Sequence, residues 1–195
     1  MLRLISALIL KILGWKIVGD IPKGINKAII VTAPHTSLSD FWIGRFTFWM
    51  RGHRINVLIK EEAFKPPFGW LLKSAGGIPV ARKNRHSHLS HQIAQEFLKR
   101  DKMYLVITPE GTRSLVFHWK KGFYQIAMEA NVPLILGFMD YPNKIGGFGP
   151  VFRPTGDYDK DIREIYKFYY DKGAKHPERF NLSPQNREKA LSKLK

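Results

Sequence analysis

The feature that most constrains this chain is the alternation, from residue 28 onward, of short β-branched segments with longer helical ones. Buried strands are predicted over five segments rich in Ile and Val and bounded by Gly, Pro or Asn: 28–33, 55–60, 78–82, 103–108 and 132–139. Helices are predicted over the four segments between them: 39–51, 61–74, 87–100 and 122–131. Two prolines in the sequence KPPF (65–68) break the second of these helices. This order predicts right-handed crossovers and an α/β fold, with a mostly parallel sheet covered by helices on both faces.

The 195 residues contain no internal repeat and no linker, which predicts a single domain. We expect three parts within it: an N-terminal apolar helix in 1–20, an α/β core in 28–153 and a polar helical tail in 154–195. Between the last predicted strand and the tail, residues 140–159 are rich in Gly and Pro and predict a loop with an edge strand. In the tail we expect one helix ending at Asp171 and another after Pro184.

Charge and cysteine content narrow the classes of function. The chain has 32 Lys and Arg against 16 Asp and Glu, a net charge of +16. Such an excess favours an anionic partner, namely nucleic acid, a lipid surface or a phosphorylated substrate. The sequence has no cysteine, which excludes a disulfide framework, a thiolate metal site and a Cys nucleophile.

The N-terminal segment 2–18 is strongly apolar but carries Arg3, Lys11 and Lys16. Its longest apolar run is too short to span a membrane, and no small-x-small cleavage site follows it. Two interpretations remain open. The segment is either a helix docked on the core or a helix lying in a membrane interface, with its lysines reaching lipid phosphates.

The most informative polar motif follows the first predicted strand, where His35 is separated from Asp40 by four residues. The two side chains can meet if His35 lies in the loop and Asp40 in the first turn of the next helix, capped by Ser37 or Ser39. The carboxylate then fixes the tautomer of the imidazole and leaves its other nitrogen as a base. No G-x-S-x-G nucleophile is present, so such a dyad suits deprotonation of a substrate hydroxyl. The alternative is an ordinary helix-start acid beside a loop histidine.

Two further motifs lie at the ends of later strands. Glu110, Gly111, Thr112 and Arg113 follow the fourth predicted strand, where Gly permits a tight turn and Arg offers a fork for phosphate or carboxylate. Arg82 ends the third predicted strand. Taken singly, the first motif has the composition of an ordinary turn, and an isolated Arg is most often a solvated residue.

Taken together, these motifs resemble the glycerolipid acyltransferases, which include the enzymes that acylate lysophosphatidic acid. The segment HTSLSD (35–40) is similar to the H-x-x-x-x-D signature, GGIPVAR (76–82) to the second block, and PEGTRS (109–114) to the third. Val132-Pro133 resembles the start of the fourth block, although the second Pro of that block is replaced within 134–137. The four blocks occur in the order of that family.

The resemblance implies transfer of a fatty acyl group from acyl-CoA or acyl carrier protein to a hydroxyl of lysophosphatidic acid or a related lysolipid, in phospholipid synthesis. His35, oriented by Asp40, would be the general base. Arg82 and residues 110–113 would hold the phosphate and glycerol of the acceptor. Backbone N–H groups at the helix start after Ser37 would stabilise the oxyanion. Neither a metal nor a cofactor is expected, and the enzyme would attach peripherally or monotopically to the cytoplasmic face of the membrane.

Two other classes of function share features with this sequence. A basic nucleic-acid-binding domain would also combine positive charge with aromatic residues, but no helix-turn-helix, RNP-like or zinc pattern is present. His86, His88 and His91 have a spacing that could place metal ligands on a helix, but no further ligand completes the sphere. These three histidines are better explained as solvated residues at the start of a helix.

Overall fold

The fold is known from a computed structural model that describes residues 1–66, 69–80 and 86–194. The strands are β1 (Lys16–Val18), β2 (Lys27–Ala33), β3 (Asn56–Lys60), β4 (Gly77–Val80), β5 (Met103–Ile107), β6 (Leu134–Asp140) and β7 (Ile145–Phe152). The α-helices are α1 (Leu2–Ile12), α2 (Leu38–Arg51), α3 (Gly69–Ser74), α4 (His86–Leu98), α5 (Gly122–Ala130), α6 (Tyr158–Tyr169) and α7 (Arg187–Ser192). Two 3-10 turns, η1 (Glu61–Phe64) and η2 (Pro177–Arg179), complete the regular structure.

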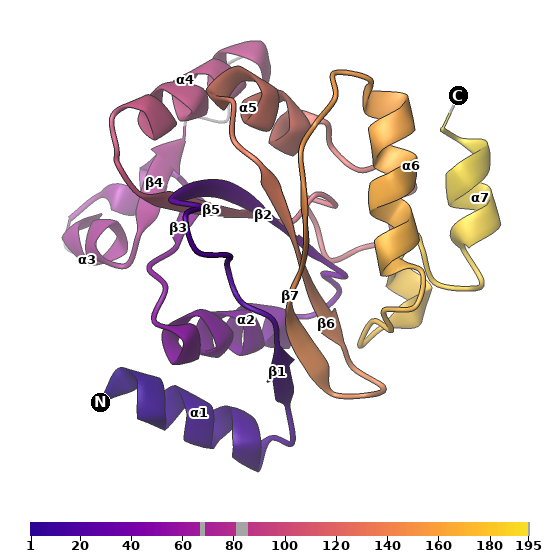
Figure 1. Cartoon of the computed structure of the whole chain (residues 1–195), viewed down its shortest axis with the longest axis horizontal. Coiled ribbons are helices and arrows are strands. Elements are labelled where there is room, and N and C mark those ends of the chain that lie inside the picture. The colour runs from indigo at the N-terminus through magenta and orange to yellow at the C-terminus, as the bar shows by residue number, and fades with distance from the viewer. Residues whose placement is uncertain (67–68, 81–85, 195) are drawn as a thin grey trace.

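The strands form one seven-stranded sheet in the order β1-β7-β6-β2-β5-β3-β4. Neighbouring strands run parallel except β6 and β7, which are antiparallel. Helices α1 and α2 lie on one face of the sheet, and α4, α5 and α6 lie on the other (Figure 1). The predicted α/β fold is therefore confirmed.

The central strand β2 shows why the sequence specifies this arrangement. Ile29 and Val31 pack into the core under α4, α5 and α6, whereas Ala28 and Ile30 pack into the core under α2. All four side chains are fully buried. A strand covered on both faces is apolar at every position, as expected in the middle of a parallel sheet.

The N-terminal segment departs from the prediction of one apolar helix. Helix α1 ends at Ile12, and Gly14 adopts a positive φ of 78° that turns the chain into β1. Strand β1 pairs in parallel with β7, so β7 is an inner strand and not the predicted edge strand. Within the described part of the chain, no helix is long and apolar enough to span a membrane.

The segment 61–74, predicted as a helix that breaks at 65–68, is divided into η1 and α3. Lys65, which precedes Pro66, has extended dihedral angles, φ −67° and ψ 151°. Proline clashes with a helical conformation of the residue before it and cannot continue the hydrogen-bond ladder. The break is thus a local consequence of Pro66. Strand β4 is described only to Val80, so Arg82, at the end of the predicted strand 78–82, lies outside the described residues.

The C-terminal tail contains the two expected helices, and its polar composition conceals an apolar face. On α6, Ile162, Ile165, Tyr166 and Tyr169 are fully buried at helical spacing against the sheet. The Tyr169 hydroxyl donates to the backbone carbonyl oxygens of β2 and β6, at 2.8 Å and 3.1 Å. The tail therefore completes the core on the face of α4 and α5.

Candidate active site

The loop between β2 and α2 brings His35 and Asp40 together. Nδ1 of His35 lies 3.3 Å from Oδ2 of Asp40, whose side chain is 1% exposed, while the His35 side chain is 21% exposed. The contact depends on the start of α2: Ser37 is the N-cap, and its Oγ accepts the N–H of Ser39 at 3.2 Å. Because Nδ1 faces the carboxylate, Nε2 of His35 is left for the crevice that this side chain lines.

The Asp40 carboxylate is surrounded by hydrogen-bond donors. Oδ2 accepts the N–H groups of Thr36 and Ser37, each at 2.8 Å, and Oδ1 accepts the hydroxyl of Tyr141 at 2.5 Å. Burial by itself raises the pKa of Asp40, but hydrogen bonds from His35, Tyr141 and the two N–H groups outweigh it and lower the pKa below its usual value. Asp40 is therefore ionised at neutral pH.

The same bonds narrow the set of backbone N–H groups that could stabilise an oxyanion. The N–H groups of Thr36 and Ser37 are bonded to Asp40. Those of Ser39 and Asp40 are bonded to the side chain and backbone oxygens of Ser37. The helix-start donors at Ser39 and Asp40 are thus occupied within the cap and are not free to stabilise an oxyanion.

Glu110 lies beneath the loop that carries His35, because β5 is the neighbour of β2 and their carboxyl ends adjoin. Its Oε1 accepts the backbone N–H of His35 at 3.1 Å, and its buried Oε2 has no partner among the described residues. The residue is 3% exposed, and this burial raises its pKa to about 8. Glu110 is thus largely uncharged at neutral pH and supports the His35 loop. Glu110 is not among the described residues that line the crevice, and its contact with a substrate stays a prediction.

The rest of the predicted phosphate-binding motif is divided between the crevice and the surface. Gly111, with a φ of 66°, lines the crevice beside His35. Thr112 is half-buried, and its Oγ1 accepts the N–H of Ser114 at 3.3 Å. Arg113 is exposed and makes no hydrogen bond or ion pair within the described ranges.

Lys120 is a candidate binding residue that sequence reasoning missed. A Cβ placed on Gly111 would lie 2.8 Å from its Nζ, so the Lys120 side chain covers this glycine. Lys120 and Lys121 both line the crevice. The signal available in the sequence was a pair of lysines directly before a predicted helix that begins at Gly122.

The crevice has a simple origin in the sheet. Strands β3 and β5 pair at only two positions, Asn56 with Leu105 and Val57 with Val106, and then diverge. Between and around them opens a space of about 1220 Å³ that reaches from His35 across both faces of the sheet. Its walls are mostly apolar and include Phe41, Trp49, Val57, Ile59, Leu72, Ile93, Ile107, Phe123 and Ile126. Such a space suits a large apolar ligand.

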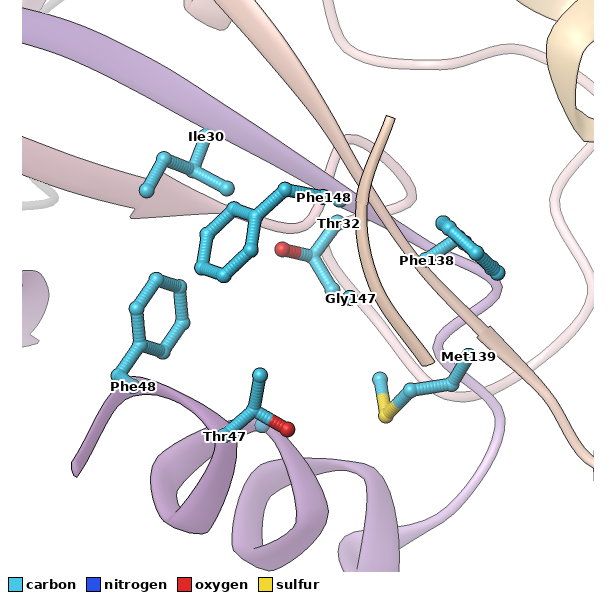
Figure 2. A pocket seen from close by; sticks show the side chains of 10 residues that line it. Ile30, Thr32, Thr47, Phe48, Phe138, Met139, Gly147 and Phe148 are labelled. Atoms are coloured by element: carbon cyan, nitrogen blue, oxygen red, sulfur yellow. The ribbon is translucent and has the colours of Figure 1, made fainter. Parts of the chain in front are cut away.

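A second cavity, between α2 and the sheet, is too small for a substrate. Figure 2 shows Thr47 and Phe48 rising from α2 toward Thr32 and Phe148 of the sheet. The enclosed volume is about 20 Å³, which is room for about one water molecule. The larger crevice is therefore the candidate binding site.

Of the three histidines with the spacing of metal ligands, the side chains of His86 and His88 lie outside the described part of the structure. His91 of α4 contacts Glu129 of α5 through Nδ1. Among the side chains that the structure describes, no group of three or more potential metal ligands comes together.

Comparison with known proteins identifies the family. The model of the Acyltransferase family matches residues 16–138, which is more than half of the chain and includes both His35 and Arg113. The chain belongs to the Acyltransferase family. The match runs from β1 into β6 and contains all four motifs on which the sequence resemblance rested.

A solved structure extends this comparison, whereas a search of curated proteins gave no significant match. This acyltransferase chain is similar to the 1-acyl-sn-glycerophosphate (LPA) acyltransferase PlsC from Thermotoga maritima, with a TM-score of 0.59 and 19% sequence identity. The alignment covers 86% of this chain and 74% of that one. At this identity the likeness shows a shared fold.

Proposed function

We propose that this acyltransferase moves a fatty acyl group from an acyl thioester to a hydroxyl of lysophosphatidic acid or a related lysolipid. The observation that carries the proposal is the buried, ionised Asp40 at 3.3 Å from Nδ1 of His35, with the second ring nitrogen of His35 left for an apolar crevice. The donor would be acyl-CoA or acyl carrier protein, both of which carry the acyl group as a thioester. Neither a metal ion nor a prosthetic group takes part in the proposed reaction.

The proposed step is general base catalysis by His35. Nε2 removes the proton from the acceptor hydroxyl. The hydroxyl oxygen of the acceptor then attacks the thioester carbonyl carbon. A C–O bond forms, the C–S bond breaks, and the leaving thiolate takes the proton from the imidazolium. The ionised Asp40 stabilises the imidazolium in between, and a positioned base of this kind contributes about 10²- to 10⁴-fold to the rate.

The crevice and its basic residues support the choice of substrates. The divergence of β3 and β5 provides an apolar space beside His35 for the acyl chain. At the mouth, Lys120 lies over Gly111, and Arg113 is exposed on the same loop. With Arg82, these cations would bind the phosphate of the acceptor, since Arg presents a planar fork that matches phosphate oxygens.

The exposed side of α1 supports attachment to a membrane surface. Leu4, Leu8 and Ile12 form one stripe at four-residue spacing and are 77%, 58% and 74% exposed. On the other side of the helix, Ser6 and Leu10 are buried against the protein. Helix α1 is thus docked on the fold and still presents an apolar stripe. We propose that this stripe lies in the interface of an anionic membrane, on its cytoplasmic face.

The activity is tested by incubating the purified protein with acyl-CoA or acyl carrier protein and a panel of lysolipid acceptors, while thiol release and lipid product are followed. His35→Ala should lower kcat by about 10²-fold or more. The matched control is His53→Gln, because His53 contacts Asp20 at 2.5 Å in a His–Asp pair outside the proposed site. No transfer by the wild-type protein to any acceptor, or undiminished turnover by His35→Ala, would refute the proposal.

Membrane attachment is tested by flotation with vesicles of phosphatidylglycerol and phosphatidylethanolamine. The triple variant Leu4→Gln, Leu8→Gln, Ile12→Gln should fold, because all three side chains are exposed, and should bind at least tenfold more weakly. The control changes Leu98 and Met128 to Gln, two exposed apolar residues on α4 and α5 across the sheet. Undiminished binding by the triple variant would place the membrane contact elsewhere.

A further inference from the structure

Tyr141 contacts the dyad from a distant part of the sequence. It follows β6 at the turn into β7, 101 residues after Asp40, and its hydroxyl donates to Oδ1 of that carboxylate at 2.5 Å. The same hydroxyl lies 2.8 Å from Oγ of Ser39. Both oxygens of Asp40 are therefore engaged: Oδ1 by Tyr141, and Oδ2 by backbone N–H groups and His35.

This arrangement determines the orientation of the carboxylate. Donors on Oδ2 alone would leave Oδ1 without a partner in a buried site, and rotation of the carboxylate would cost little. With a donor on each oxygen, rotation breaks hydrogen bonds to a charged group, which are worth more than neutral ones. Burial and the neighbouring Asp40 raise the pKa of Tyr141 well above its usual value, so its hydroxyl keeps the proton that it donates.

Tyr141 is itself held in place by its surroundings. Its ring meets Trp15 edge to face at a centroid distance of 5.0 Å. Its backbone N–H donates to the carbonyl oxygen of Gly173 at 2.8 Å, and the N–H of Gly173 donates to Oδ1 of Asp140 at 3.0 Å. These bonds attach the turn between β6 and β7 to the segment that follows α6.

The same C-terminal segment also reaches the loop that carries His35. The N–H of His176 donates to Oγ1 of Thr36 at 3.2 Å, and Nζ of Lys175 donates to Oγ of Ser39 at 3.1 Å. Residues 173–176 therefore bridge the two segments that must meet at Asp40.

We propose that Tyr141 is a positioning residue of the dyad, whose hydroxyl fixes Asp40 in the orientation that directs the basic nitrogen of His35 into the crevice. Residues 173–176 keep Tyr141 and the His35 loop in register. The inference rests on the proposed role of His35 as base. Tyr141 does not touch the substrate, and no proton passes through it; it acts through Asp40.

The test is Tyr141→Phe, which removes the hydroxyl and keeps the ring that packs on Trp15. We expect kcat to fall about tenfold, with KM for both substrates within twofold of wild type, because geometry at the base changes and substrate contacts do not. The control is Tyr104→Phe, which removes a hydroxyl that donates to the carbonyl oxygen of Ile25 at 2.7 Å, away from the dyad. It should leave kcat unchanged.

A second readout does not depend on activity. In ¹⁵N NMR spectra of histidine-labelled protein without substrate, His35 of the wild type should be the single tautomer with its proton on Nδ1, and Tyr141→Phe should show a mixture of tautomers. Gly173→Ala perturbs the same turn from the other side, because its Cβ would lie 2.5 Å from the ring of Pro142. It should reduce kcat severalfold.

The outcomes separate this inference from the proposed function. If the wild type transfers no acyl group, the proposed function fails, and the NMR spectra still decide whether Tyr141 positions the dyad. Wild-type kcat and a single Nδ1–H tautomer in Tyr141→Phe would overturn the inference, as would an equal loss of kcat in Tyr104→Phe. Should Tyr141→Phe not fold, wild-type kcat and tautomer in Gly173→Ala would overturn it.

Discussion

Replacing Glu110 by Gln tests the conclusion that a neutral carboxyl group supports the His35 loop. The amide keeps the size of the side chain, and its oxygen can still accept the His35 N–H that Oε1 accepts at 3.1 Å. What the substitution removes is the ability to ionise. The two proteins should therefore differ chiefly in how their stability depends on pH.

The sign and size of this change in stability with pH follow from the pKa of Glu110, which burial raises from 4.5 to about 8. Because the folded protein binds this proton more tightly than the unfolded chain, the contribution to stability is complete below about pH 4.5 and is lost as the pH rises through about 8. At about 1.36 kcal/mol per pH unit, the loss between pH 5 and pH 8 is about 3 to 4 kcal/mol. Glu110→Gln should not show this loss.

Urea unfolding followed by tryptophan fluorescence at several pH values measures the effect. Other groups also titrate over this range, so the quantity of interest is the difference in the free energy of unfolding between Glu110→Gln and wild type. That difference should shift by about 3 to 4 kcal/mol in favour of the variant from pH 5 to pH 8. The control Glu62→Gln removes an exposed carboxylate of η1 and should run parallel to wild type. A parallel curve for Glu110→Gln would refute a buried, protonated Glu110.

Three further variants test the site. Asp40→Asn should fold and lose about 10²-fold in kcat through loss of the Nδ1–H tautomer, and full turnover would make the 3.3 Å contact with His35 incidental. Arg113→Lys keeps the charge without the fork and should raise KM for the acceptor more than for the donor; equal shifts would assign Arg113 to the donor. Gly44→Leu should stabilise α2 by about 0.5–1 kcal/mol, because an added Cβ meets nothing within 4 Å. The added side chain should also narrow the crevice, so that long-chain acyl donors react more slowly than short-chain donors. An unchanged preference for chain length would mean that the acyl chain does not pass α2.

Local patterns predicted most of the sheet and allowed His35 to meet Asp40, a contact that the family resemblance implied. Strand β2 is recognisable because every residue from 28 to 31 is apolar, and Asp40 lies in a helix start whose cap, Ser37, is a strong signal. Pro66 likewise predicts the break in the segment 61–74, which the structure shows between η1 and α3. The information needed there is local.

Other features depend on contacts that no local pattern contains. Tyr141 reaches Asp40 only because β6 pairs with β2, so nothing near residue 141 indicates its hydrogen bond. Glu110 lies in a segment with the composition of an exposed turn, and its burial follows from the adjacent loop after β2. Strand β1 has three residues and exists only through its pairing with β7, below the length at which periodicity is detectable.

The early separation of β3 from β5 has a consequence for how chain length would be selected. In a continuous sheet, the space beyond Val57 and Val106 would be filled by paired backbone. Here the acyl chain would occupy that place, with β3 and β4 on one side and β5 and β2 on the other. An acyl chain bound as proposed would then pack against both parts of the sheet. The longest chain accepted would depend on how far those parts stand apart, so that substitutions which shift β3 relative to β5 would change specificity without touching His35.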